Sequence, residues 1–142
     1  MRTLKLFIVL LFFTNAYAEN AYAEEGDSLN PETTMVPSLS ILNLKHVLIA
    51  EGVQHPDIVL RQAITETGWF KCENCSLSRN NIFGFYYKKK YLKFDSWIEC
   101  VKYYKRWQGR HYKGGDYYTF LKKVGFATNP RYVQDLKSLK LN

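Results

Sequence analysis

The stretch from Gln62 to Trp69, QAITETGW, is the one around which the rest of the chain is arranged. It reads as the end of an apolar helix that carries one carboxylate, Glu66, and stops at Gly68. Apolar neighbours deprive Glu66 of hydration, which disfavours its charged form and raises its pKa, and the carbonyls at a helix end act in the same direction. Such a carboxyl can protonate a leaving-group oxygen near neutral pH. For this octapeptide alone, the alternative is an exposed glutamate in an ordinary last turn.

Two further segments follow in order, 80–85 (NNIFGF) and 125–132 (GFATNPRY). Together with 62–69 they resemble the glucosaminidase family of peptidoglycan hydrolases, whose members show a Q-A-x-x-E-[ST]-G-W helix end, an N-N-[LI]-F-G turn and a G-Y-A-T-D-P-x-Y segment. The resemblance covers roughly 39–139. It implies a mainly α, lysozyme-like fold with a helical lobe, a small β-hairpin lobe and a cleft between them.

The apolar periodicity and the capping residues predict the same mainly α architecture. Residues 70–79 read as a loop, and the aromatic segment 83–94 reads as a small hairpin. Five helices are expected, at 40–51, at 56 to about 67, at 97 to about 110 behind a Ser96–Glu99 capping box, at 117–124, and from an Asn129–Pro130 cap to about 140.

Residues 1–18 predict a secretory signal peptide, with a basic start, an apolar run at 6–13 and an Ala-x-Ala site at 16–18. A second such site at 21–23 leaves two possible cuts. The apolar run is too short to span a bilayer, so we expect a protein exported to the periplasm or the extracellular space, without stable membrane insertion and monomeric. Residues 19–37 hold five acids and no base and predict a disordered leader. The domain is expected over 38–142.

The charge of that domain predicts an anionic partner. Residues 38–142 hold 18 Lys and Arg against eight Asp and Glu, a net charge of +10. Export and the three motifs argue against nucleic acid, and the anionic polymer available to an exported bacterial protein is the cell wall. The expected partner is therefore the peptidoglycan glycan strand. For the Lys88–Lys90 run, simple solubilisation of the surface is a strong alternative.

The three cysteines predict a disulfide and no metal centre. Cys72 and Cys75 have the spacing of half a zinc site, but no second Cys or His pair follows, so no metal and no other cofactor are expected. A Cys72–Cys75 bridge that staples the loop after Glu66 is the expectation. A bridge from either of them to Cys100 is the alternative.

Glycoside cleavage usually uses two carboxylates, and the resemblance gives Glu66 the role of general acid. The family also carries an acidic residue on the hairpin, whereas 83–94 of this chain contains none. Asp95, which follows the hairpin, is the candidate base. Two alternatives need only Glu66: the substrate's N-acetyl group acts as the nucleophile, or the chemistry is that of a lytic transglycosylase. A one-glutamate mechanism is favoured.

Substrate contacts are expected from five residues in or near the three motifs: Trp69, Asn81, Phe83, Tyr86 and Tyr132. Aromatic faces stack on sugar rings, and an Asn amide can donate to a hydroxyl or an acetamide. Each has a structural alternative, a turn for Asn81 and a core position for Phe83 and Tyr132. Phe126 stands where the family usually shows Tyr, so any role of that hydroxyl is missing here.

The sequence therefore predicts an exported endo-β-N-acetylglucosaminidase that cleaves the N-acetylglucosamine–N-acetylmuramic acid backbone of peptidoglycan. A muramidase or a lytic transglycosylase on the same fold is the closest alternative. A non-catalytic cell-wall-binding module is an alternative of another class, which the acid-free hairpin keeps open.

Overall fold

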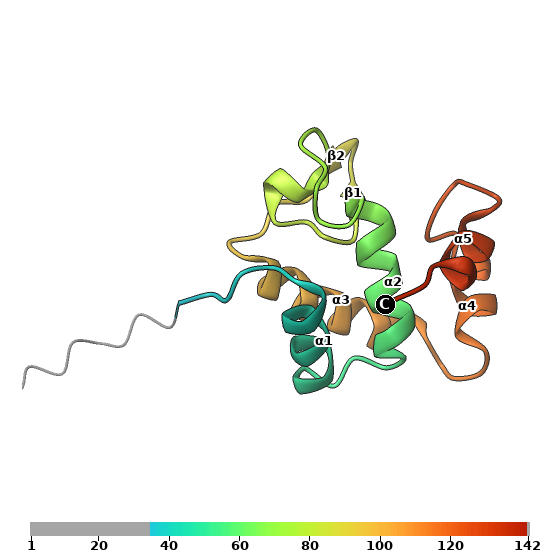
Figure 1. Ribbon diagram of the computed structural model, residues 1–142. Helices are drawn as coiled ribbons and strands as arrows, with labels where there is room; N and C mark the ends of the chain where they lie inside the picture. Colours follow the sequence, from blue (N-terminus) through green and yellow to red (C-terminus); the bar gives the residue numbers. More distant parts are fainter. Residues whose placement is uncertain (1–34, 142) are drawn as a thin grey trace, which may run out of the picture. The chain divides into compact units, whose positions relative to one another are not determined.

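The structure is a computed structural model that describes residues 35–141, and this part of the chain contains five α-helices and one two-stranded hairpin (Figure 1). The mainly α fold with a small β-hairpin is thus confirmed. The predicted signal peptide and nearly all of the predicted leader lie outside the described residues. Between 35 and 141, no helix combines the length and the apolar character needed to cross a membrane.

Helices α1 (Ile41–Ala50) and α2 (Pro56–Thr67) begin and end where their capping residues predict. The Ser40 hydroxyl accepts from the main-chain N–H of Asn43 at the start of α1, at 3.1 Å. Pro56 opens α2, and Gly68 ends it with a φ of 52°, a left-handed conformation that glycine adopts without steric cost. The α2 boundaries place Glu66 in its last turn.

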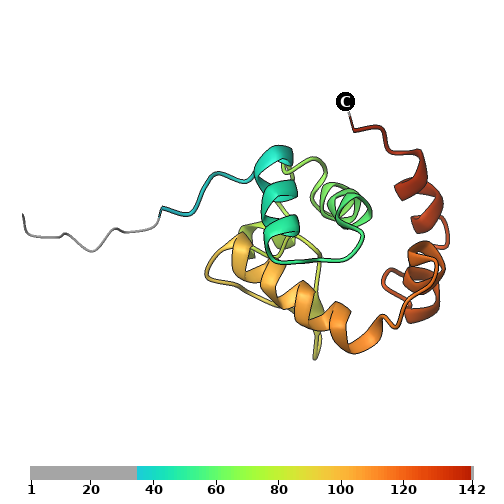
Figure 2. The ribbon, with the colours of Figure 1, turned by 90° about the horizontal axis from the view of Figure 1, so that it is seen from below.

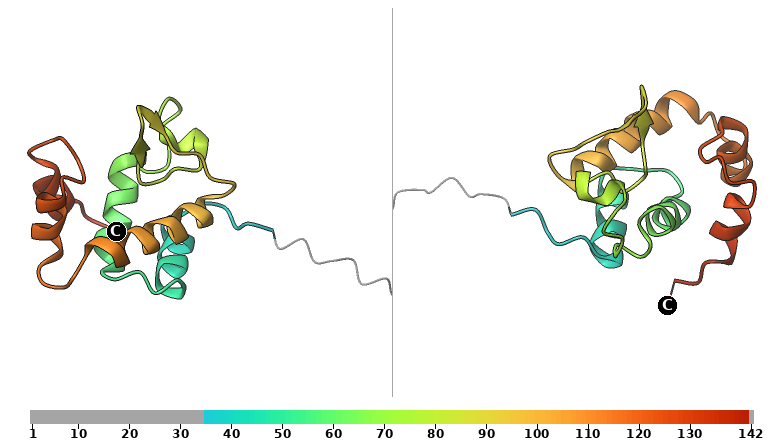
Figure 3. Two further views of the ribbon diagram at one scale, coloured as in Figure 1. Left: turned by 180° about the vertical axis from the view of Figure 1, so that it is seen from behind. Right: turned by 90° about the horizontal axis from the view of Figure 1, so that it is seen from above.

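Helix α2 is the centre of the domain. It contacts α1 and α5, and in Figures 2 and 3 it lies between α1 on one side and α4 and α5 on the other. Six of its twelve residues are therefore buried, more than a single stripe of the helix would contribute. The buried residues of α2 are Val59, Leu60, Gln62, Ala63, Ile64 and Thr67.

The hairpin pairs β1 (Tyr86–Tyr87) with β2 (Lys90–Tyr91) in antiparallel register, Tyr86 opposite Tyr91. The Asn81 amide holds its base together, because Nδ2 donates to the carbonyls of Phe85 at 2.8 Å and Leu92 at 3.0 Å. Figure 1 shows the hairpin beside the C-terminal end of α2. The small lobe is thereby fixed next to Glu66.

The remaining helices are α3 (Trp97–His111), α4 (Tyr117–Val124) and α5 (Tyr132–Ser138). The Ser96 hydroxyl caps α3 as predicted, but the Glu99 carboxylate does not return to Ser96 and instead pairs with Lys102 at 2.9 Å. Helix α5 begins two residues after Pro130, because the Asn129 side chain accepts from the N–H of Arg131 in a turn that precedes the helix.

The loop after α2 contains a short 3₁₀ turn, Ser76–Arg79, which the sequence pattern did not predict. Cys72 and Cys75 form a disulfide in this loop, as expected, and the alternative bridges to Cys100 are wrong. The Cys100 thiol is free and buried, and burial raises its pKa to about 12. Such a thiol stays protonated and unreactive.

Candidate active site

Glu66 lies half-buried in the last turn of α2. Burial removes water from its carboxyl and raises the pKa above the ordinary value of 4.5, as the sequence predicts. A hydrogen bond from the Tyr132 hydroxyl, on α5, favours the charged form and opposes part of that rise. The group thus combines a proton held more tightly than usual with a partner that fixes its orientation.

The turn before the hairpin brings main chain directly against this carboxyl. A Cβ at Gly84 would lie 2.8 Å from Oε2 of Glu66, so the carboxyl or the turn would have to shift, and Gly84 has a φ of +65° that strains any other residue. Both facts favour glycine at this position. The N-N-I-F-G segment therefore serves to seat the glutamate and to form one wall beside it.

A chain of buried polar side chains continues inward from Glu66. Gln62, one turn earlier on α2, donates to the Tyr132 hydroxyl at 3.3 Å and accepts from Tyr104 on α3 at 2.6 Å. The Tyr104 hydroxyl also bonds to that of Tyr117 on α4, at 2.7 Å, and Tyr117 accepts from Gln108 at 2.8 Å. No buried side-chain nitrogen or oxygen in the described residues lacks a partner. The network fixes α3, α4 and α5 relative to α2, and so holds Tyr132 at the carboxyl.

A hollow of about 430 Å³, here called the central hollow, opens next to this group. Its lining comes from the segment before and into the hairpin, from the end of α3 and from the end of α4: Phe83, Gly84, Phe85, Tyr86, Trp107, His111, Val124, Gly125 and Phe126. Gly84 touches Glu66. The Phe126 ring stacks on Tyr132 with 6.0 Å between centroids, and Tyr132 bonds to Glu66. Glu66 is not itself a lining residue of the central hollow, and it is connected to the hollow through Gly84 and through Tyr132 and Phe126.

Two of the predicted sugar platforms are exposed where a ligand can reach them. Trp69 follows Glu66 closely and is 44 % exposed, and Tyr86 lines the central hollow and is 59 % exposed. Gly68, Trp69 and Phe70 all have positive φ, at 52°, 62° and 62°. Side chains rarely adopt this conformation, and such strain concentrates at functional sites. Sugar stacking on Trp69 and Tyr86 remains a prediction that this geometry permits.

The prediction that Asn81 contacts substrate is corrected by its burial. Asn81 is 0 % exposed, and its amide is occupied by the hairpin: Nδ2 donates twice, and Oδ1 accepts from the N–H of Phe85 at 2.9 Å. Phe83 is 1 % exposed, with its ring 4.4 Å from that of Tyr104. It forms the floor beneath the central hollow rather than a surface for sugar. Both residues position the site.

Tyr132 is buried, and its hydroxyl faces Glu66 and Gln62. The structure therefore places Tyr132 beside the proposed acid, and its contact with substrate remains a prediction. Asp95 is different. It is exposed, its main-chain carbonyl accepts from Asn80 at 3.1 Å, and within residues 35–141 its carboxylate forms no hydrogen bond or ion pair. The structure does not bring Asp95 and Glu66 into contact, and its role as a base remains a prediction.

Trp107, His111 and Phe126 are among the hollow-lining residues that were not predicted as site residues. Trp107 and His111 are one turn apart on α3 and stack at 5.2 Å between centroids, and Phe126 lies 5.4 Å from Trp107. The i, i+4 spacing of an aromatic pair was the available signal.

The comparisons with known proteins identify the class. The profile of the Glucosaminidase family, described as mannosyl-glycoprotein endo-beta-N-acetylglucosaminidase, matches residues 43–140. This is more than half of the chain, and the protein belongs to that family, which confirms the resemblance seen in the three motifs. The family consists of glycoside hydrolases that act on glycans. No curated protein and no solved structure matches the chain.

Proposed function

We propose that this protein is an exported, monomeric endo-β-N-acetylglucosaminidase that cleaves the N-acetylglucosamine–N-acetylmuramic acid backbone of peptidoglycan, with Glu66 as general acid. The observation that carries the proposal is the half-buried Glu66 carboxyl with a raised pKa, seated against Gly84 at the edge of an aromatic hollow. An acid of this kind holds a proton at a pH where an exposed glutamate has lost it. The predicted export signal and the net positive charge of residues 38–142 suit a wall substrate.

The chemistry needs only this one carboxyl if the substrate supplies the nucleophile. Glu66 donates its proton to the glycosidic oxygen as the bond from that oxygen to C1 of N-acetylglucosamine breaks, and the next sugar leaves as an alcohol. The acetamide oxygen of the same sugar bonds to C1 and gives an oxazolinium ion. Water then displaces the acetamide oxygen from C1 and gives a proton to the Glu66 carboxylate, which restores the acid and the acetamide and leaves a reducing N-acetylglucosamine end.

The other residues at the site would support these steps without exchanging protons. The Tyr132 hydroxyl stabilises the Glu66 carboxylate after it has given its proton away, since it donates to the charged form. Trp69 and Tyr86 would hold sugar rings by stacking, and Trp107 and Phe126 form apolar walls. A wall of this kind excludes water from the developing charge.

A lytic transglycosylase is the second candidate, favoured by the lack of Asp and Glu in residues 83–94. It would cut at N-acetylmuramic acid instead. The C6 hydroxyl of that sugar would then attack C1 in place of water, give its proton to the Glu66 carboxylate and form an anhydro end, again with Glu66 as the only protein acid. The two activities differ in which sugar carries the new end.

The test is a digest of purified peptidoglycan with the wild-type protein, Glu66→Gln, and Glu73→Gln, an exposed glutamate in the following loop, as a matched control. Mass spectrometry before and after borohydride reduction identifies the new ends. Reducing N-acetylglucosamine ends from the wild type and from Glu73→Gln, absent with Glu66→Gln, support the proposal. Anhydro or reducing N-acetylmuramic ends replace it by the second candidate or by a muramidase. No new ends, with binding to the wall intact, leave a binding module.

Two further measurements address the remaining parts of the proposal. Asp95→Asn keeps its activity if the mechanism uses one carboxyl, and loses it if Asp95 is the base. N-terminal sequencing of the protein recovered from outside the cytoplasm tests export. A start at residue 19 or residue 24 supports the predicted signal, whereas an intact residue 1 contradicts it.

A further inference from the structure

The hairpin carries a second hollow beside the central one. It has a volume of about 340 Å³, is lined by Arg79, Tyr86, Lys89, Lys90 and Tyr91, and is here called the hairpin hollow. The segment 79–94 contains five bases and no Asp or Glu. Among residues 35–141 the ion pairs are Lys45–Asp57 and Lys102–Glu99, so none of these five bases is paired with an acid of the described chain. The surface of the hairpin hollow is therefore positive and free to bind an anion.

The backbone at the hairpin tip is strained at two of these lysines. Lys88 and Lys89 connect β1 to β2 and have φ values of 47° and 63°. A two-residue hairpin turn with both φ values positive strongly favours Asn and Gly, because the Cβ of most other residues lies too close to the following carbonyl oxygen there. In the described residues, glycine occupies six positions of positive φ, and Lys88 and Lys89 are two of the six that other residues occupy. Strain that is tolerated at an exposed turn is a sign of function.

Tyr86 joins the two hollows, since it lines both of them. Its ring lies 5.0 Å from that of Tyr91 across the hairpin, and both rings are about half exposed. A glycan strand bound along the central hollow would therefore pass Tyr86 and continue to the basic side chains. Sugar rings can stack on the aromatic faces there, and the Arg79, Lys89 and Lys90 head groups can donate hydrogen bonds to acidic groups.

We propose that the hairpin hollow is a subsite for carboxylates carried by the substrate strand itself, with Arg79, Lys89 and Lys90 as the binding groups. The proposal rests on the proposed function for the identity of the strand. N-acetylmuramic acid bears a lactyl group and, through it, a peptide with free carboxylates, while N-acetylglucosamine bears none. Because Tyr86 belongs to both hollows, the anion is expected on the same molecule that occupies the central hollow rather than on a separate polymer.

The subsite would give the enzyme a preference for strands that still carry free carboxylates. Exposed charge pairs contribute modestly, so loss of two of them is expected to lower affinity by about three- to tenfold rather than to abolish binding. The effect belongs to the bound ground state. It therefore raises KM and leaves kcat close to that of the wild type.

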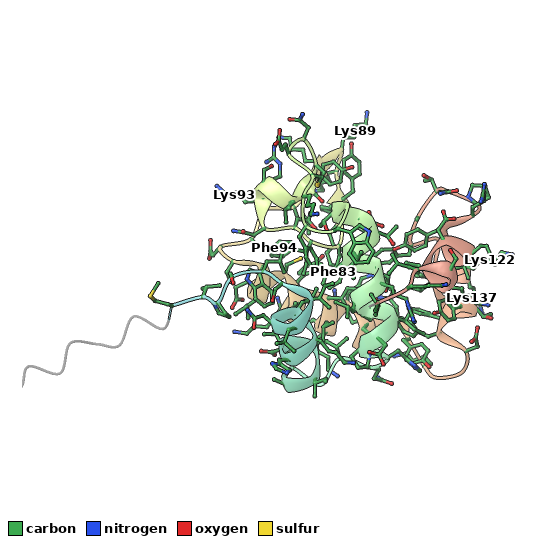
Figure 4. The ribbon with its side chains drawn as sticks, in the orientation of Figure 1. Phe83, Lys89, Lys93, Phe94, Lys122 and Lys137 are labelled. Atoms are coloured by element: carbon green, nitrogen blue, oxygen red, sulfur yellow. A yellow bond between two sulfur atoms is a disulfide. The ribbon has the colours of Figure 1, made fainter. Side chains whose placement is uncertain are left out.

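The experiment compares the wild type with Lys89→Gln/Lys90→Gln. A charge-matched control, Lys122→Gln/Lys137→Gln, removes two exposed lysines on α4 and α5, which Figure 4 shows away from Lys89 across α2. Each protein is tested on peptidoglycan stripped of phosphate polymers and on the same material with its carboxylates converted to methylamides. Cleavage gives KM and kcat, and sedimentation of protein with the polymer gives Kd.

The proposal expects the hairpin variant to bind the carboxylate form about three- to tenfold more weakly than the wild type, with both proteins equal on the amidated form and the control pair near the wild type. An equal loss in the control pair, or a loss on both substrates, overturns it in favour of general charge attraction. A loss seen only on walls that retain phosphate polymers overturns it in favour of an anionic polymer. Kd is measured without cleavage. The binding test therefore still decides on the subsite if the digest shows that the protein does not cleave peptidoglycan.

Discussion

Replacing Gly84 by alanine would test the close approach of the hairpin segment to Glu66. An ideal Cβ at residue 84 lies 2.8 Å from Oε2 of Glu66, whereas ordinary contacts of a Cβ begin near 3.4 Å. The carboxyl or the turn must therefore move by about 0.6 Å. Since a displacement near 1 Å at a reacting group costs about 100-fold in rate, we expect kcat to fall by about 10- to 100-fold.

The same substitution also carries a backbone cost that must be separated from the contact. With a φ of +65° at residue 84, an alanine is strained by about 1–2 kcal/mol. Gly52 has the same φ of +65°, and a Cβ there meets only the mobile end of Lys105, at 3.7 Å. Gly52→Ala is therefore the matched control. It has the same strain, with no contact to the site.

The assay measures urea unfolding and peptidoglycan cleavage for both variants. We expect both to lose about 1–2 kcal/mol of unfolding free energy, and only Gly84→Ala to lose turnover. If Gly84→Ala cleaves at the rate of Gly52→Ala, the carboxyl is not held in place by the turn, and the reasoning is refuted. If both variants lose the same activity, the cause is the lower unfolding free energy and not a displacement of the Glu66 carboxyl.

Three further predictions follow from the same geometry. The folded protein holds the Glu66 proton more tightly than the unfolded chain does. The contribution of this group to the unfolding free energy is therefore complete below pH 4.5 and declines as the pH rises through the raised pKa of the folded state. Urea titrations across pH should show this decline for the wild type and not for Glu66→Gln. Tyr132→Phe removes an acceptor for buried Gln62, which should cost about 1–2 kcal/mol of unfolding free energy, and removes a hydrogen bond that lowers the Glu66 pKa, so the limb of the pH–rate profile above the optimum should move to higher pH. Lys89→Gly relieves a φ of 63° and should raise the unfolding free energy by about 1 kcal/mol while it weakens binding to carboxylate-bearing peptidoglycan; a gain in stability with unchanged binding would contradict the hairpin subsite.

Local signals in the sequence predicted the helices well, because each boundary depends on a few adjacent residues. The expected helix at 56 to about 67 matches α2, which ends at Gly68, and Ser96 was correct as the cap of α3. The end of the chain was less regular. Asn129 closes a turn of its own instead of capping α5, and a side chain with both options cannot be assigned from neighbours alone.

For the candidate site, the sequence singled out Glu66, whereas it did not predict how the residues around Glu66 are arranged. Glu66 stands out in sequence because a single carboxylate occurs in an apolar helix end, and its raised pKa agrees with that reading. Asn81 was expected to contact sugar, but its amide closes the base of the hairpin through partners 4 and 11 residues away. Burial of a polar side chain depends on whether distant main chain satisfies it, which no short pattern reveals.

By itself, the sequence determined the helical architecture, the membership of the family and the choice of Glu66, because caps, periodicity and short motifs act within a few residues. Only the tertiary structure decided what surrounds that carboxyl. Gly84 meets it from the hairpin segment and Tyr132 from α5, and Gln62 joins Tyr132 to the buried network. These contacts join residues far apart in the chain, and they exist only because α2 is packed between α1, α3 and the α4–α5 pair.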